Sequence, residues 1–277
     1  MEKIKANEIK KVGIIAGSGS LPRHVADACI KKGIDFILIG TADNTSHELY
    51  QDIKYETFQL YAVSKVIKKL HAEGVSHIVL AGKVRRATLS KLLLDFKGAK
   101  LLANIIKGGL NDNSILLTIV EFFENEGFKI ISPEHVATDI LVKSGPLTKK
   151  QPSEENWEDI KKGVKILKGI AEYDVGQALV IQGGLVLGVE AAEGTDELIK
   201  RCGNIRQQDD EEVILVKICK PKQDKRVDLP CIGPNTIQNL HLNGLAGVAI
   251  EAGAALILDE AATRDEADRL GVFIYGI

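Results

Sequence analysis

Short apolar runs alternate with amphipathic stretches through the first half of the chain. The apolar runs are continuous, which is typical of strands buried on both faces of a parallel sheet. The amphipathic stretches repeat their apolar side chains at helical spacing. The predicted strands cover residues 12–15, 36–39, 78–80 and 130–131, and the predicted helices cover 21–33, 63–70 and 115–123. This β-α-β-α order predicts a parallel sheet covered by helices.

The pattern changes after residue 143. The stretch 144–157 is polar, contains Pro146 and Pro152 and shows no apolar period, so we predict an interdomain linker there. Next, two strand-like runs flank Gly183-Gly184, which predicts a hairpin with a two-residue turn. Further strands are predicted over 213–217 and 248–250, and helices near 236–242 and 260–270. We therefore predict an α/β protein with a Rossmann-like parallel-sheet domain over residues 1–143 and a mixed α/β domain over 158–277.

Composition narrows the function. The 277 residues include 36 basic and 38 acidic ones, a net charge of −2, which argues against an extended nucleic-acid surface. We find no secretory h-region and no apolar stretch long enough to cross a bilayer, so we expect a cytoplasmic protein that touches a membrane only at its surface. The four cysteines lack zinc-site spacing. Serine-hydrolase and P-loop motifs are absent as well.

A glycine-rich loop follows the first predicted strand. Its sequence is Ala16-Gly17-Ser18-Gly19-Ser20-Leu21-Pro22. Glycines let backbone amides approach a phosphate, and a helix N-terminus adds partial positive charge. The dinucleotide fingerprint requires a glycine at position 22, where this chain has proline, so an NAD or flavin site is poorly supported. A tight turn with proline near the first helical position explains the loop equally well.

Two further segments of the first half could bind substrate. Gly82, Lys83 and Arg85 directly follow the strand 78–80, at the sheet edge where parallel sheets bind ligands, so these cations suit a phosphate. A solvated basic loop is the alternative. Asp112 opens a predicted helix, and its simplest role is helix capping, although it could also hold a ribose hydroxyl or a metal.

The most charge-dense segment lies in the second half. Residues 220–230 place Asp224 and Asp228 among the four cations of a proline-bounded loop. Such a mixture suits Mg²⁺ bound through oxygen, with cations neutralising phosphate. Upstream, residues 190–196 offer more oxygen ligands between a strand and a helix, although a capped turn accounts for them too.

Several of these motifs together resemble the UDP-2,3-diacylglucosamine pyrophosphatases of the LpxI type. The resemblance runs in order from residue 12 to the closing Gly271-Val272-Phe273-Ile274-Tyr275-Gly276. Its motifs are Ile14 to Pro22, Asp174-Val175-Gly176-Gln177-Ala178, Val189 to Asp196, Lys220 to Pro234, and Gly244-Leu245-Ala246-Gly247. Three segments depart from the family: Asn111-Asp112-Asn113 replaces Gly-Asp-Asp, Glu134-His135 reverses a His-Glu pair, and Lys83-Val84-Arg85-Arg86 differs in detail from the usual strand-end loop.

The resemblance implies an enzyme of lipid A biosynthesis. It would hydrolyse the pyrophosphate of UDP-2,3-diacylglucosamine to UMP and 2,3-diacylglucosamine 1-phosphate (lipid X), using Mg²⁺. The first domain would bind the nucleotide and the second the lipid. The implied setting is the inner-membrane surface on its cytoplasmic side, without nucleic acid, and a homodimer is possible. A nucleotide-lipid carrier without catalysis, or an oxidoreductase using the Gly17/Gly19 loop, remains the alternative.

The resemblance and the motifs together define the expected site. Asp228 is the expected essential carboxylate, and Asp224, Arg226 and Lys220 are the other expected catalytic residues. The expected Mg²⁺ ligands are Asp228, Asp224 and Glu190. The expected substrate-binding residues are Ala16, Gly17, Ser18, Gly19, Leu21, Pro22, Gly82, Lys83, Arg85, Asp112, Gln177, Glu193, Gly194, Thr195 and Asp196.

Overall fold

The computed structural model divides the chain into two compact units. It describes residues 9–41, 47–59, 62–82, 95–109, 112–173, 175–207, 211–220 and 224–277, with only the backbone at 41, 47, 112 and 113. The first unit comprises Met1–Asp139 and Asp224–Asp228, and the second comprises Ile140–Gln223 and Leu229–Ile277. A short piece of the second half of the chain therefore belongs to the first unit. Lys83 and Arg85 lie outside the described residues.

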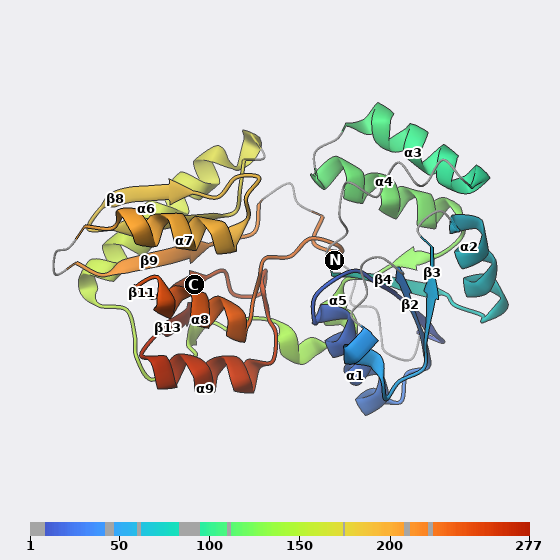
Figure 1. Cartoon of the computed structure of the whole chain (residues 1–277), viewed down its shortest axis with the longest axis horizontal. Coiled ribbons are helices and arrows are strands. Elements are labelled where there is room, and N and C mark those ends of the chain that lie inside the picture. The colour runs from blue at the N-terminus through green and yellow to red at the C-terminus, as the bar shows by residue number, and fades with distance from the viewer. Residues whose placement is uncertain are drawn as a thin grey trace. The chain divides into compact units, whose positions relative to one another are not determined.

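The first unit is built on a five-stranded parallel sheet in the order β3-β2-β1-β4-β5 (Figure 1). The central strand β1 pairs with β2 and β4, with Val12 opposite Phe36 and His77. Its strands are β1 (Val12–Ala16), β2 (Phe36–Thr41), β3 (Tyr55–Phe58), β4 (His77–Ala81) and β5 (Lys129–Ile130). All their carboxyl ends meet at one edge, where parallel sheets bind ligands.

Helices cover both faces of this sheet. On one face, α2 to α4 pack on an apolar cluster that includes Ile37, Leu70 and Ile78, and the ring of Phe123 joins it. On the other, α1 contacts β1, β2 and β4, and α5 packs beside it (Figure 1). The helices are α1 (Leu21–Lys32), α2 (Val63–Ala72), α3 (Phe96–Gly108), α4 (Asp112–Asn125) and α5 (Pro133–Val136), with short 3₁₀ turns at His47–Tyr50 and Thr138–Ile140.

The second unit contains a six-stranded mixed sheet in the order β6-β13-β11-β9-β7-β8. β13, β11 and β9 run parallel, whereas β7 is antiparallel to β9 and to β8, and β6 is antiparallel to β13. A separate two-stranded ladder joins β10 to β12. The strands are β6 (Gly145–Pro146), β7 (Ala178–Gln182), β8 (Leu185–Val189), β9 (Val213–Lys217), β10 (Cys231–Ile232), β11 (Leu245–Ile250), β12 (Leu256–Ile257) and β13 (Phe273–Gly276).

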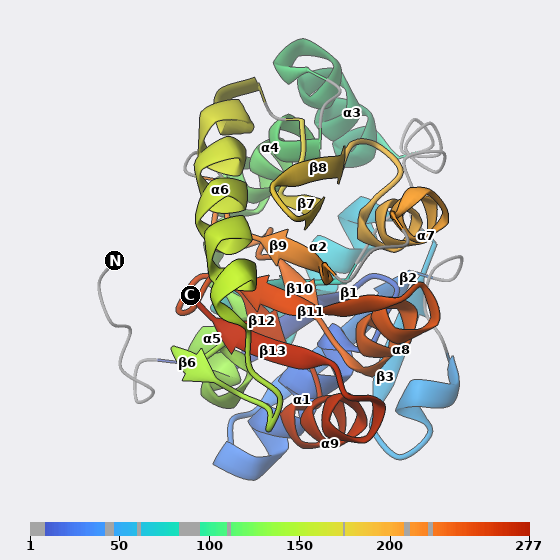
Figure 2. The same ribbon diagram turned by 90° about the vertical axis from the view of Figure 1, so that its left-hand side faces the viewer.

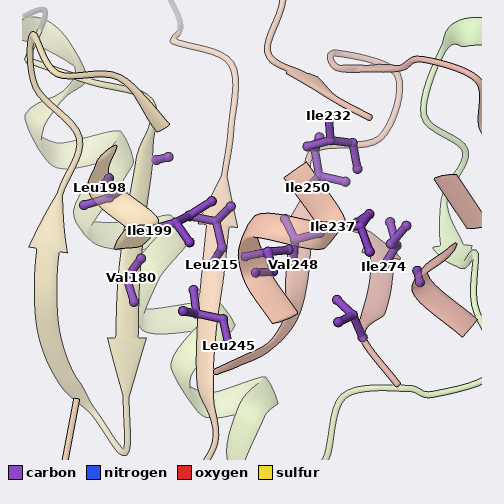
Figure 3. Close-up of a cluster of buried hydrophobic side chains, with 14 of the residues drawn as sticks. Val180, Leu198, Ile199, Leu215, Ile232, Ile237, Leu245, Val248, Ile250 and Ile274 are labelled. Atoms are coloured by element: carbon purple, nitrogen blue, oxygen red, sulfur yellow. The ribbon is translucent and has the colours of Figure 1, made fainter. Parts of the chain in front are cut away.

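Alternate side chains of these strands enter two apolar layers. On one face they pack against α6 (Glu154–Ile170), which approaches closely because Gly163 has no side chain: a Cβ there would lie 2.9 Å from Val216. On the other they pack against α7 (Thr195–Ile205), α8 (Pro234–Leu242) and α9 (Glu260–Leu270). Figure 2 shows α6 and α7 on opposite sides of the sheet. Figure 3 shows the second layer, in which Ile199 faces Leu215 and Ile237 lies by Val248.

The predicted α/β class, with a parallel sheet first and a mixed sheet second, is confirmed. The Gly183-Gly184 hairpin is confirmed as well, with positive φ values of 51° and 77° that suit glycine. The stretch 144–157, predicted as a linker, carries β6 and the first residues of α6 and lies in the second unit. The capping box between Ser153 and Asn156 starts α6 within that stretch. The sequence analysis did not predict β3, α3 or β13.

Candidate functional site

The loops after β1 and β4 touch each other at the carboxyl edge of the first sheet. The Gly17 N–H donates to the Ala81 carbonyl at 2.7 Å. Gly82 has φ 89°, and a Cβ at that position would lie 2.5 Å from the Ser18 carbonyl oxygen. Only glycine fits this approach, because any side chain would push the two loops apart. The structure therefore brings Gly82 together with Gly17 and Ser18.

The N-terminus of α1 opens onto the same loop. Ser20 occupies the N-cap without a side-chain capping bond, and the first turn carries no acidic residue. Leu21 and Pro22 form that turn, and Pro22 is buried. Amide N–H groups at a helix start without a capping side chain can donate hydrogen bonds to the oxygens of a phosphate. The position of Asp112 is known only as the first residue of α4, because its side chain is not described.

Asp224 organises the segment of the second half that belongs to the first unit. We call residues 224–228 the catalytic arm, after the role that the sequence predicts for Asp228. The carboxylate of Asp224 accepts the Arg226 N–H at 2.9 Å, and its carbonyl accepts the amides of Val227 and Asp228 at 3.0 and 3.2 Å. The Arg226 guanidinium returns to the same carboxylate, with Nη2 2.7 Å from Oδ2. These bonds close the catalytic arm into a tight turn.

Two side chains join the catalytic arm to the first unit. Val227 packs against the apolar cluster beneath α2 to α4. The Nη1 atom of Arg226 donates to Oε1 of Glu124, near the end of α4, at 2.6 Å. Sequence reasoning missed Glu124, since the two residues are 102 positions apart and no local motif marks the helix side chain.

The pair Asp224 and Arg226 neutralise one another. Burial tends to raise the pKa of Asp224, but hydrogen bonds from the Arg226 side chain and backbone outweigh it and hold the pKa below its ordinary 3.8. The Asp224 carboxylate raises the pKa of Arg226, and Glu124 contributes a smaller effect in the same direction. Asp224 is therefore ionised at neutral pH and already bound to a cation. Asp228 and Lys220 are both half-buried, and Lys220 lies in the second unit.

A buried polar chain occupies one edge of the second sheet. Glu190 follows β8, Thr195 begins α7, and Lys217 ends β9. The Lys217 ammonium donates to Oγ1 of Thr195 at 2.8 Å, and that hydroxyl donates to Oε1 of Glu190 at 2.7 Å. Lys217 and Glu190 are only 5% and 7% exposed. The hydroxyl thus links two buried opposite charges.

Gln177 completes this group, which we call the Lys217 cluster: Gln177, Glu190, Thr195 and Lys217. The Gln177 backbone N–H donates to Oε2 of Glu190 at 3.2 Å, so both oxygens of the carboxylate accept hydrogen bonds. Within the described part of the chain, the side-chain oxygen of Gln177 is buried and has no hydrogen-bond partner. A buried acceptor without a donor is costly, which makes this atom a candidate contact for a ligand. Lys217 was missed because it closes an otherwise apolar strand.

The other expected residues of this edge are more exposed. Gly194 is the N-cap of α7, with φ 82°. The Glu193 carboxylate accepts a hydrogen bond from Arg201 Nη2 at 3.0 Å, and the Asp196 carboxylate accepts one from the Asn239 side-chain amide at 3.0 Å. A hydrogen bond from its own backbone N–H lowers the pKa of the Glu193 carboxyl, and a hydrogen bond from Arg201 contributes a smaller effect in the same direction.

The expected Mg²⁺ ligands are divided between the two units: Asp224 and Asp228 belong to the first and Glu190 to the second. Within the residues that the structure describes, no three Asp, Glu, His or Cys side chains come together as a metal site. Asp224 is bound to Arg226, and Glu190 is enclosed by its own hydrogen bonds in the second unit. Mg²⁺ usually takes one or two protein carboxylates and completes its shell with phosphates and water. Asp228 fits that single-carboxylate role.

Comparison with known proteins identifies the family. Residues 11–140 match the LpxI N-terminal domain, and residues 143–275 match the LpxI C-terminal domain. The chain belongs to the LpxI family. A relative from Caulobacter vibrioides (strain ATCC 19089 / CIP 103742 / CB 15), UDP-2,3-diacylglucosamine pyrophosphatase LpxI, is 35% identical over 97% of this chain and 98% of its own length.

Likeness to solved structures is much weaker. The UDP-glucose 4-epimerase of Thermus thermophilus, in complex with NAD, aligns with a TM-score of 0.31 and 11% identity, covering 94% of this chain and 83% of the epimerase. The biotin carboxylase subunit of pyruvate carboxylase aligns with a TM-score of 0.22 and 14% identity, over 69% of this chain and 39% of its own. Neither adds to the family relationship.

Proposed function

We propose that this protein hydrolyses the pyrophosphate bond of UDP-2,3-diacylglucosamine to UMP and lipid X in lipid A biosynthesis. The observation that carries the proposal is the match to both LpxI domains together with 35% identity over 97% of the chain to the Caulobacter enzyme. One water molecule is consumed and one phosphorus–oxygen bond of the pyrophosphate breaks, so that each product keeps one phosphate.

In this proposal Asp228 is the essential carboxylate. It lies at the end of the catalytic arm, where its backbone N–H is held by the Asp224 carbonyl. A carboxylate fixed in this way can orient the attacking water and accept its proton. Mg²⁺, when bound by Asp228 and by substrate oxygens, would polarise the phosphoryl group. Lys220 is the cation proposed to offset the developing negative charge.

The loops of the first unit are the proposed nucleotide site. The amides around Gly17 and Gly19 and the start of α1 suit the phosphate of the UMP portion. The Lys217 cluster suits the polar head of the sugar lipid, because Gln177 presents an acceptor without a donor and Lys217 is a buried cation. Hydroxyl and phosphate groups of a glucosamine 1-phosphate could satisfy both.

We also propose that the enzyme works on the cytoplasmic surface of the inner membrane. None of the described helices combines the length and apolar character that a bilayer crossing requires. The exposed face of α3 suits surface binding: Phe96 and Ile106 are 87% and 62% exposed, Lys100 and Lys107 are exposed between and beside them, and the helix has no acidic residue. Such a face binds anionic lipid. The homodimer stays a prediction.

The deciding experiment measures UMP and lipid X released from UDP-2,3-diacylglucosamine in detergent, with Mg²⁺ and then with excess EDTA. We expect both products from the wild type with Mg²⁺ and neither with EDTA. Asp228→Asn should lose at least about 1,000-fold in kcat while keeping the wild-type unfolding curve. Tight substrate binding without turnover would instead favour the carrier. A thermal shift on adding NADH would favour the oxidoreductase.

A further inference from the structure

We propose that Glu124 is a positioning residue of the hydrolase: through Arg226 it holds the catalytic arm on the first unit and so places the carboxylate of Asp228. The inference rests on the proposed function, in which Asp228 contacts the reacting phosphate. Neither Glu124 nor any other residue of α4 after Asp112 was expected in the site from the sequence.

Hydrogen bonds within the catalytic arm hold it in one conformation. Asp224 accepts the backbone amides of Arg226, Val227 and Asp228, the first through its carboxylate and the others through its carbonyl. The guanidinium of Arg226 then clamps the same carboxylate through Nε and Nη2. Asp224 thus links the backbone of Asp228 to the side chain of Arg226. A contact that holds Arg226 therefore also restrains Asp228.

Two side chains of the catalytic arm, Val227 and Arg226, contact the rest of the first unit. Val227 contributes a partly buried apolar contact, which is not directional. The Arg226–Glu124 bond at 2.6 Å supplies a directional, charge-assisted contact between the catalytic arm and α4. Glu124 is 42% exposed and Arg226 33% exposed, so the pair is open to screening by salt.

The guanidinium of Arg226 is already bound on two sides. Its Nε and Nη2 face Asp224, and its Nη1 faces Glu124, so two carboxylates surround one guanidinium. A guanidinium compensated in this way offers little free charge to a phosphate. The geometry therefore assigns Arg226 to orienting the catalytic arm, in place of the direct charge neutralisation expected from the sequence.

The test compares four variants with the wild type in the turnover assay. Glu124→Gln should lower kcat about fivefold with KM within about twofold, the effect of losing one exposed ion pair that positions Asp228. Arg226→Met should lower kcat about 100-fold, because it also releases Asp224. The double variant should be no slower than Arg226→Met, since both changes break one chain of contacts. Glu121→Gln, an exposed glutamate one turn earlier on α4, is the matched control and should equal the wild type.

A second readout does not depend on activity. Lys225 is exposed in the catalytic arm, so trypsin can cleave after it once the arm detaches. Mass spectrometry should show cleavage after Lys225 several-fold faster in Glu124→Gln than in the wild type or Glu121→Gln. Unchanged kcat and unchanged cleavage in Glu124→Gln would overturn the proposal. No UMP release from the wild type would contradict the proposed function, and an active Asp228→Asn enzyme would contradict the role proposed for Asp228; in either case the cleavage rates would still decide whether Glu124 anchors the arm.

Discussion

The ammonium of Lys217 lies 2.8 Å from the hydroxyl oxygen of Thr195, at the buried edge of the second sheet. That hydroxyl in turn donates to Glu190, so a single neutral group joins two charges that are almost excluded from solvent. Buried charges are tolerated only when their hydrogen bonds are complete. Thr195 is therefore the residue on which the Lys217 cluster depends.

Replacing Thr195 tests this dependence. Thr195→Val keeps the shape of the side chain but removes the hydroxyl, leaving Lys217 and Glu190 each short of a partner. We expect the free energy of unfolding to fall by about 2–4 kcal/mol, measured by urea denaturation. Thr195→Ser keeps the hydroxyl and should cost less than about 1 kcal/mol. Equal losses of unfolding free energy in the two variants would show that the Thr195 hydroxyl does not stabilise the Lys217 cluster.

The contact between the loops after β1 and β4 gives a second prediction. Gly82→Ala places a methyl group 2.5 Å from the Ser18 carbonyl oxygen, so the loops must separate. Gly74→Ala is the matched control, because Gly74 also has a positive φ, 69°, its added Cβ meets nothing within 4 Å, and it lies outside the proposed nucleotide site. We expect Gly82→Ala to weaken UMP binding at least about tenfold more than the control, by isothermal titration. Similar affinities would remove the loop contact from the nucleotide site.

The N-cap of α3 predicts a pH dependence of stability. Asp95 accepts the Gly98 N–H at 3.0 Å and the Ser64 hydroxyl at 2.7 Å. Burial acts to raise the pKa of Asp95, but the bonds from Ser64 and Gly98 prevail and keep it below the ordinary 3.8. A lowered folded-state pKa contributes stability above pH 3.8 that disappears as the pH falls through the folded value.

Asp95→Ala should therefore cost about 1–2 kcal/mol of unfolding free energy at pH 7. The gap between variant and wild type should narrow as the pH falls below 3.8, because the unfolded wild-type chain then binds a proton at Asp95 that the folded chain binds only at lower pH. Urea unfolding followed at pH 7, 5 and 3 measures both effects. A gap that stays constant across this range would mean that the ionised carboxylate contributes nothing, and that the lost packing alone destabilises the variant.

The exposed face of α3 predicts binding to anionic membranes. A variant with Phe96→Ser, Lys100→Glu and Lys107→Glu should lose at least about tenfold in sedimentation with phosphatidylglycerol vesicles, because it removes an inserted ring and reverses two charges. Vesicles of phosphatidylcholine should bind the wild type weakly. Leu242→Ser, which removes a 78% exposed leucine from α8, is the control for loss of an exposed apolar side chain. Equal loss in that control would place the membrane contact elsewhere.

The local pattern of apolar residues and glycines predicted the parts of the fold that depend on neighbouring residues. The apolar runs of β1, β2 and β4 and the helical period of α1 were visible because burial imposes its period directly on the chain. The Gly183-Gly184 turn was visible because positive φ angles select glycine. The strand β3 is only four residues long and contains no buried run, and α3 was missed although its apolar side chains recur at helical spacing. β3 was not predicted at all, although its pairing with β2 completes the edge of the sheet.

The amino-acid sequence alone established the α/β class, the family resemblance, and Asp228 and the glycine loops as candidates, because each rests on residues close together in the chain. Tertiary structure decided that residues 224–228 belong to the first unit, that Glu124 meets Arg226, and that Lys217 meets Thr195. These relationships join residues 102 and 22 positions apart. A charged side chain on a helix or at a strand end looks alike whether it faces water or a distant partner, and only the folded chain brings that partner within hydrogen-bonding distance.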